Sequence, residues 1–176
     1  MVRIGIGAIA AGFLVADDES AALKALLVFV PAIASRMVRA PAAFDLLFAV
    51  TLAVEALGTG LGVYHRVGWP DGGSHLLIPF VSAPIVYQGF VRLGATTAPE
   101  EPRAFTGTGL VVAAGVLAVG ALWELVEWGA DGVFGTDYSQ GYTDTLSDLL
   151  ADAFAASAGG VAVAVWLGSP ATWPQQ

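Results

Sequence analysis

The chain has 176 residues, of which 56% are hydrophobic and 12% charged, and its seven basic and fifteen acidic residues give a net charge of −8. Soluble domains carry about 25% charged residues, so this composition and the mean hydropathy of +0.73 exclude an ordinary soluble domain and indicate a lipid-facing surface. The acidic balance argues against nucleic acid as a partner, which needs a basic face, and the lack of cysteine excludes disulfides and thiolate metal ligands.

Six apolar segments in chain order approach the length of about 20 residues that a membrane-spanning helix needs. They are Val2–Ala16, Ala21–Val38, Ala42–Tyr64, Ser74–Leu93, Thr106–Trp128 and Thr143–Leu167. The first is short, so five spans plus an interfacial helix is the alternative. The acidic residues that follow it favour a retained span over a cleaved signal peptide. We therefore expect one all-α domain over residues 1–176, a polytopic integral membrane bundle of about six transmembrane helices.

The basic residues predict the orientation of this bundle, because cytoplasmic loops are enriched in lysine and arginine. With a cytoplasmic N-terminus, five of the seven basic residues fall inside, and Lys24 and Arg66 fall outside. Both termini are then cytoplasmic, and twelve of the fifteen acids lie toward the outer face. Five of those acids interrupt apolar spans: Glu55, Glu124, Glu127, Asp148 and Asp152.

Acids inside spans are costly, at about 2.5–3.5 kcal/mol each at the bilayer centre. Two outer bases are too few to neutralise five of them. Protonation, a water-filled cavity or a bound cation must then compensate the charge. A divalent cation compensates the most charge at once.

Helical spacing brings several of these acids to one level. Glu124 and Glu127 share a helix face, and Asp144, Asp148 and Asp152 form a stripe with successive residues about 6 Å apart. The predicted metal ligands are His75, Glu124, Glu127, Asp148, Asp71 and Glu55, with Asp144 or Asp152 as a general base. Carboxylates favour Mg²⁺, Ca²⁺ or Mn²⁺, and an imidazole admits iron or Zn²⁺, so the metal stays open.

Simpler interpretations compete for several residues. Asp144 could only cap the last helix, and Asp71 could be a turn residue in Pro-Asp-Gly-Gly. Trp123, Trp128 and Tyr138 could belong to an aromatic belt at the outer interface. The glycine-rich stretch 129–141 could be a lid or merely a connector.

Three motifs resemble those of the YjdF-like inner-membrane proteins of bacteria and archaea. They are Asp71-x-x-x-His75, Trp123-Glu124-x-x-Glu127-Trp128 and Asp144-Thr145-x-x-Asp148-x-x-x-Asp152, within a match over about residues 40–160. The inserted Pro70 departs from the family pattern and affects the register of Asp71 more than that of His75. The resemblance implies a small multi-pass protein of a prokaryotic plasma membrane and supplies no activity.

The first functional hypothesis is a metal-dependent hydrolase acting on a lipid or lipid-linked substrate at the outer leaflet. An ion- or proton-coupled transporter is the second, in which Glu55 and Asp152 matter most because they lie deeper. The third is a non-catalytic accessory or scaffold subunit. Membrane lipids are the expected partners in each, and the oligomeric state is open.

Overall fold

The computed structural model describes residues 2–63, 70–96 and 102–168. Every regular element in these ranges is an α-helix, which confirms the all-α prediction. The helices are α1 (Val2–Val15), α2 (Glu19–Met37), α3 (Ala42–Gly60), α5 (Pro70–Arg92), α6 (Pro102–Phe134) and α7 (Tyr142–Gly168).

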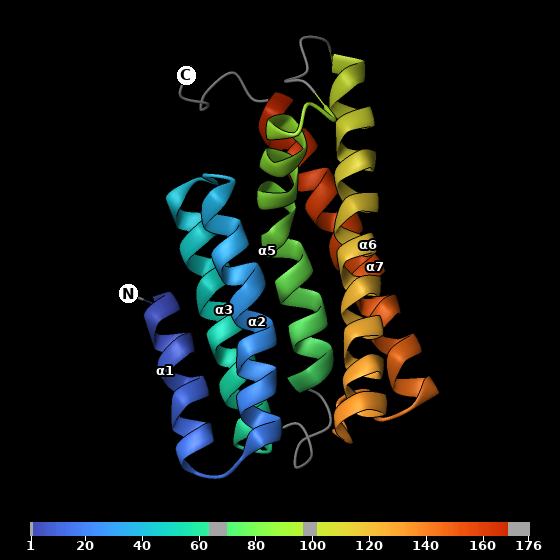
Figure 1. Ribbon diagram of the computed structural model, residues 1–176. Coiled ribbons are helices and arrows are strands. Elements are labelled where there is room, and N and C mark those ends of the chain that lie inside the picture. Colours follow the sequence, from blue (N-terminus) through green and yellow to red (C-terminus); the bar gives the residue numbers. More distant parts are fainter. Residues whose placement is uncertain (1, 64–69, 97–101, 169–176) are drawn as a thin grey trace.

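The helices form two groups of three (Figure 1). In the first, α1, α2 and α3 pack on one another, and in the second, α7 packs on both α5 and α6. Contacts between α3 and α5 join the groups. The apolar core has two clusters. The one around Val28 and Leu52 also includes Val81 and Ile85 of α5, and the other surrounds Val112 and Val163. Helix α5 contributes to both clusters, and its contacts with α3 form the seam between the two groups.

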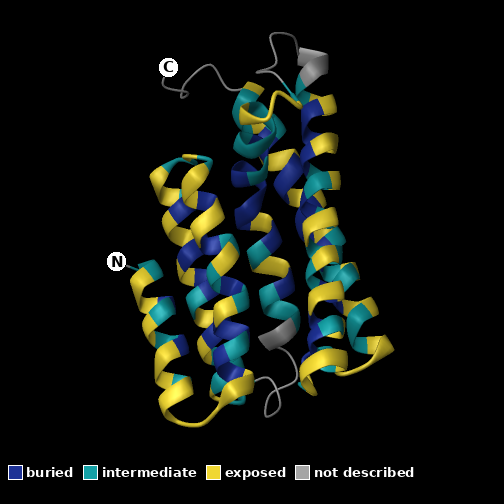
Figure 2. Ribbon diagram, viewed as in Figure 1, coloured by how far each residue is buried: buried dark blue, intermediate teal, exposed yellow. Residues whose placement is uncertain are grey.

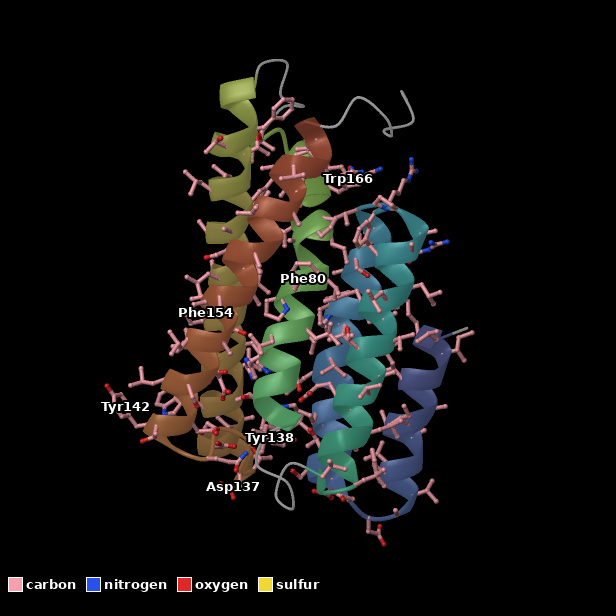
Figure 3. The ribbon with its side chains drawn as sticks, turned by 180° about the vertical axis from the view of Figure 1, so that it is seen from behind. Phe80, Asp137, Tyr138, Tyr142, Phe154 and Trp166 are labelled. Atoms are coloured by element: carbon pink, nitrogen blue, oxygen red, sulfur yellow. The ribbon has the colours of Figure 1, made fainter. Side chains whose placement is uncertain are left out.

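The outer surface of the bundle is apolar, as a lipid-embedded protein requires. Exposed residues line the outward helix faces and buried residues the inward faces (Figure 2), and large side chains such as Phe154 project from the surface (Figure 3). Phe154 is 67% exposed and Val161 is 64% exposed. Apolar side chains at such positions lose nothing in hydrocarbon, whereas water would penalise them.

Five of the described helices, α2, α3, α5, α6 and α7, are long and apolar enough to cross a membrane. The 14 residues of α1 extend only about 21 Å at 1.5 Å per residue, which is less than the hydrocarbon thickness of about 30 Å. The polytopic helical membrane bundle is thus confirmed, with five long spans and one short helix.

Proline and glycine occur where lipid-embedded helices tolerate them. Pro31 lies inside α2, and Pro79 and Pro84 lie inside α5. At the crossing of α6 and α7, a Cβ added to Gly109 would lie 2.8 Å from the carbonyl oxygen of Gly160. This approach is possible only without side chains, in line with the small residues expected at helix interfaces in lipid.

Candidate functional site

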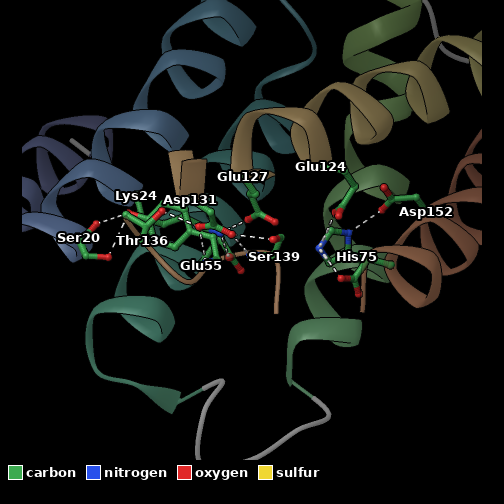
Figure 4. A network of polar contacts seen from close by, with 12 residues as sticks. Ser20, Lys24, Glu55, His75, Glu124, Glu127, Asp131, Thr136, Ser139 and Asp152 are labelled. Carbon is green, nitrogen blue, oxygen red and sulfur yellow. Dashed lines mark hydrogen bonds and ion pairs between the residues drawn. The ribbon is translucent and has the colours of Figure 1, made fainter. Parts of the chain in front are cut away.

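Seven ionisable side chains are buried together near the end of the bundle that carries the connections from α1 to α2 and from α6 to α7. Figure 4 shows most of this network. Each residue is at most 9% exposed, and five different helices contribute them: Lys24, Glu55, His75, Glu124, Glu127, Asp148 and Asp152. The network divides into a histidine group on α5, α6 and α7 and a lysine group on α2, α3 and α6.

In the histidine group, the Nε2 atom of His75 faces two carboxylates. The Nε2 atom of His75 lies 3.9 Å from Glu124 Oε1 and 4.0 Å from Asp148 Oδ2. One ligand atom from each of the three residues falls within 4.8 Å of the others. Since α5, α6 and α7 each supply one atom, the group depends on the packing of all three helices.

Asp152 contacts the other ring nitrogen. Its Oδ1 atom lies 3.0 Å from His75 Nδ1, within hydrogen-bonding distance. In the neutral tautomer with the proton on Nδ1, the ring donates to this carboxylate and the Nε2 lone pair is directed away from it. Asp152 is 1% exposed, and it lies one helical turn from Asp148, as the predicted stripe requires.

Gly120 makes room for the Asp152 carboxylate. A Cβ at this position would lie 2.1 Å from Asp152 Oδ2 and 2.8 Å from its Cγ, far inside contact distance. Gly120 is one turn before Glu124 on α6, so α6 supplies both a charged side chain and the space for its neighbour. The sequence contains this glycine, but its role depends on which face of α6 meets α7.

The histidine group has more negative charge than its described neighbours compensate. The Oδ2 atom of Asp152 is buried without a hydrogen-bond partner among the described residues. The Glu124 carboxylate is buried beside the Thr145 side chain, a neutral donor that supplies no compensating charge. With a neutral imidazole, the three carboxylates carry three negative charges in their ionised form. Burying such charge is unfavourable by several kcal/mol per ion unless a proton or cation compensates it.

The lysine group pairs two of the predicted acids with a base. The sequence predicts that two outer bases are too few for the five acids within the spans, and the structure shows which two of these acids one base, Lys24, pairs with. Lys24 Nζ lies 3.6 Å from Glu55 Oε1 and donates a short hydrogen bond to Glu127 Oε1. Lys24 lies within α2, about one turn from its start, so its side chain points between α3 and α6 rather than into a loop. The sequence shows a single lysine in an apolar segment, but it does not show toward which helices the side chain of that lysine points.

Two aromatic rings complete the surroundings of Lys24. Its Nζ atom lies 5.0 Å from the ring centroids of both Trp123 and Tyr138, a distance at which the ring faces attract an ammonium group. Tyr138 is 8% exposed and donates a hydrogen bond to the Ser20 carbonyl. These two residues therefore contribute to the site, whereas Trp128, at 71% exposed, has the exposure expected of a belt residue.

The connection from α6 to α7 is shorter and more ordered than the glycine-rich stretch suggested, because α6 continues to Phe134. Asp131 accepts hydrogen bonds from the Thr136 hydroxyl, the Tyr138 backbone N–H and both donors of Ser139. These bonds fold the loop back against α6 and direct Tyr138 toward α2. Burial raises the pKa of the Tyr138 phenol, which keeps it protonated as a donor.

Two further predicted site residues, Asp144 and Asp71, are not among these seven. Asp144 is in the first turn of α7 rather than at its cap, half-buried and one turn before Asp148. Asp71 belongs to the backbone of α5, but its side chain lies outside the described residues. The structure thus brings together His75, Glu124, Asp148 and Asp152, and it separates Glu55 and Glu127 from them by their pairing with Lys24.

Together, the fold and the site define a polytopic helical membrane protein with a buried carboxylate and imidazole cluster. The sequence matches a family described as predicted membrane protein (DUF2238) over residues 2–169. The chain belongs to this family, in agreement with its resemblance to YjdF-like membrane proteins. No curated protein and no solved structure matches the chain.

Proposed function

We propose that the protein binds one divalent cation between His75 Nε2, Glu124 and Asp148, and that Asp152 orients the imidazole from its Nδ1 side. The convergence of these three ligand atoms, with Asp152 on the opposite ring nitrogen, carries the proposal. Metal-bound histidines almost always donate their second N–H to a carboxylate, carbonyl or water. Metal bonds of about 2.0–2.6 Å, depending on the ion, require only small movements of these side chains.

The charge balance supports a cation over protons alone. A divalent ion reduces three buried negative charges to one, and it places a positive charge beside the buried Glu124 carboxylate. The lysine group needs no such ion, because Lys24 already lies between Glu55 and Glu127. We therefore propose one metal per chain, with Glu55 and Glu127 serving as partners of Lys24 rather than as metal ligands.

Three protein ligands leave coordination positions open, which is typical of catalytic rather than structural metal sites. We propose that the protein is a metal-dependent hydrolase that acts on a lipid or lipid-linked substrate. The bound cation would polarise the substrate and activate water. Asp144 lies in the first turn of α7, one turn before Asp148. It is the proposed general base, because Asp152 already contacts His75. Its half-buried position suits access to water better than the 1% exposure of Asp152.

The proposed setting is the plasma membrane of a prokaryote, with both termini in the cytoplasm and the site toward the outer face. The distribution of basic residues supports this orientation. The substrate would then approach from the outer leaflet.

Lipid turnover in vesicles tests this function. Purified protein is incorporated into vesicles of total polar lipid, and the products are identified by mass spectrometry with and without EDTA. We expect hydrolysis products that EDTA abolishes and that Mn²⁺, Mg²⁺ or Zn²⁺ restores, with at least 100-fold less product for Asp148→Asn. Asp17→Asn, at an exposed position, is the matched control. Undiminished turnover by Asp148→Asn would refute the proposal.

A further inference from the structure

A cavity of about 100 Å³ lies in the seam between the two helix groups, beside the histidine group. Its walls come from α2, α3, α5, α6 and α7. They include Val28, Leu52, Phe48, Ile78, Val116 and Trp123. The first three are 1%, 4% and 7% exposed, and Val116 is 1% exposed. The cavity therefore reaches side chains that bulk lipid does not contact.

The cavity has a polar end and an apolar end. His75, Asp152 and Glu55 line it at the level of the buried network, and Phe48 and Ser82 line it deeper in the bundle. The seven residues from His75 to Ser82 along α5 correspond to a depth of roughly 10 Å. The Ser82 hydroxyl donates to the Pro79 carbonyl at 2.9 Å, so it offers no donor to an occupant. Such an apolar end stays dry or takes up hydrocarbon, as an engineered cavity of about 150 Å³ takes up benzene.

This polarity runs parallel to that of a lipid in the adjoining leaflet. A lipid also has its polar group near the membrane face and its chain toward the bilayer centre. Within the bundle, the direction from His75 to Phe48 is the same. The volume suits a few methylene groups of one chain rather than a whole lipid. Water or a polar solute would find few partners at the deep end.

We infer that the cavity binds a segment of one hydrocarbon chain of the substrate and so positions its polar linkage at the histidine group. This inference rests on the proposed function for the chemistry at the polar end, and it narrows the substrate to amphiphiles with a flexible apolar chain. Ile78, one turn after His75, becomes a positioning residue for that chain.

Photo-crosslinking tests the occupant directly. The protein is placed in vesicles of phosphatidylethanolamine and phosphatidylglycerol that contain a small fraction of phosphatidylglycerol with a diazirine on one acyl chain. After illumination, peptide mass spectrometry locates the adducts. We expect adducts on the buried Val28, Leu52 and Val116 as well as on the exposed Val161. Adducts confined to exposed positions such as Val161 would overturn the inference.

Two variants and a metal measurement keep the result interpretable. Ile78→Phe fills the cavity, whereas Leu77→Phe, at a 47% exposed position, adds the same ring outside it. We expect Ile78→Phe to reduce adducts on the buried residues at least fivefold, and Leu77→Phe to leave them unchanged. Equal loss in both variants would overturn the inference. Bound metal is measured in the same samples, so a protein that takes up the chain without metal refutes the proposed function but not the chain site.

Discussion

Gly120→Ala is a small change with a large expected effect on the histidine group. The new Cβ would lie 2.1 Å from Asp152 Oδ2, and contact distances below 3.0 Å are essentially never seen for a real Cβ. The carboxylate must therefore move by about 1 Å or more. Asp152 is 1% exposed, and its carboxylate must move away from the new Cβ, which we expect to lengthen its 3.0 Å contact with His75 Nδ1.

The loss can be estimated from the effect of such carboxylates at known metal sites. Removing the partner of a metal-bound histidine typically lowers metal affinity 10- to 100-fold, which corresponds to about 1.4–2.8 kcal/mol. We expect Gly120→Ala to bind the metal that much more weakly, measured by equilibrium dialysis against buffered metal. Asp152→Asn should show a similar loss, because its amide is a poorer partner for the Nδ1–H.

The matched control is Gly129→Ala on the same helix. An added Cβ at Gly129 meets nothing within 4 Å. Both substitutions favour the helix by about 1 kcal/mol through backbone propensity, so they differ in the contact with Asp152. Wild-type metal affinity in Gly120→Ala would refute the role given to Asp152, and an equal loss in Gly129→Ala would show that the effect is not local.

Three further predictions concern the neighbouring groups. Lys24→Met should lower the free energy of unfolding by about 3–5 kcal/mol, because a buried ion pair loses one partner. Denaturation in detergent measures this loss, and adding Glu127→Gln to the Lys24→Met chain should restore part of it. Tyr138→Phe removes the hydrogen bond to the Ser20 carbonyl and should cost about 1 kcal/mol in the same assay, so an unchanged midpoint would contradict the described loop position. Metal affinity should fall as the pH is lowered, because protons compete for the ligand atoms; titration at several pH values checks this, and a pH-independent affinity would contradict imidazole and carboxylate ligation.

Much of the fold follows from sequence pattern because lipid imposes strong constraints. The length of the apolar segments predicted the five long spans that the structure contains among its described helices. The end of α6 was missed, because glycines that break helices in water are tolerated in a helix near the membrane. As a result, α6 continues from Gly129 to Phe134, beyond its predicted end.

The site was predictable in part. Periodicity along one helix placed Asp148 and Asp152 on a common face, and the chain order brought α5, α6 and α7 together. The periodic spacing of residues along each helix does not determine how one helix is rotated about its axis relative to another. That rotation decides that Asp152 meets the Nδ1 side of His75 and that Lys24 turns toward Glu127. These two pairings divide one predicted acidic cluster into two groups.

The transport alternative makes a distinct prediction. If the buried acids carry ions, Glu55→Gln should reduce flux into proteoliposomes while leaving metal binding intact. The pairing of Glu55 with Lys24 gives it a structural partner instead. We therefore expect no specific ion flux in wild-type proteoliposomes, and flux that depends on Glu55 would favour the transporter over the hydrolase.

Elemental analysis of the purified protein tests the central claim most directly. The wild-type chain should contain about one divalent metal ion per molecule, Glu124→Gln should contain almost none, and Glu19→Gln, at an exposed position, should match the wild type. Metal-free wild-type protein after exposure to each candidate ion, or an unchanged metal content in Glu124→Gln, would contradict a cation held by His75, Glu124 and Asp148.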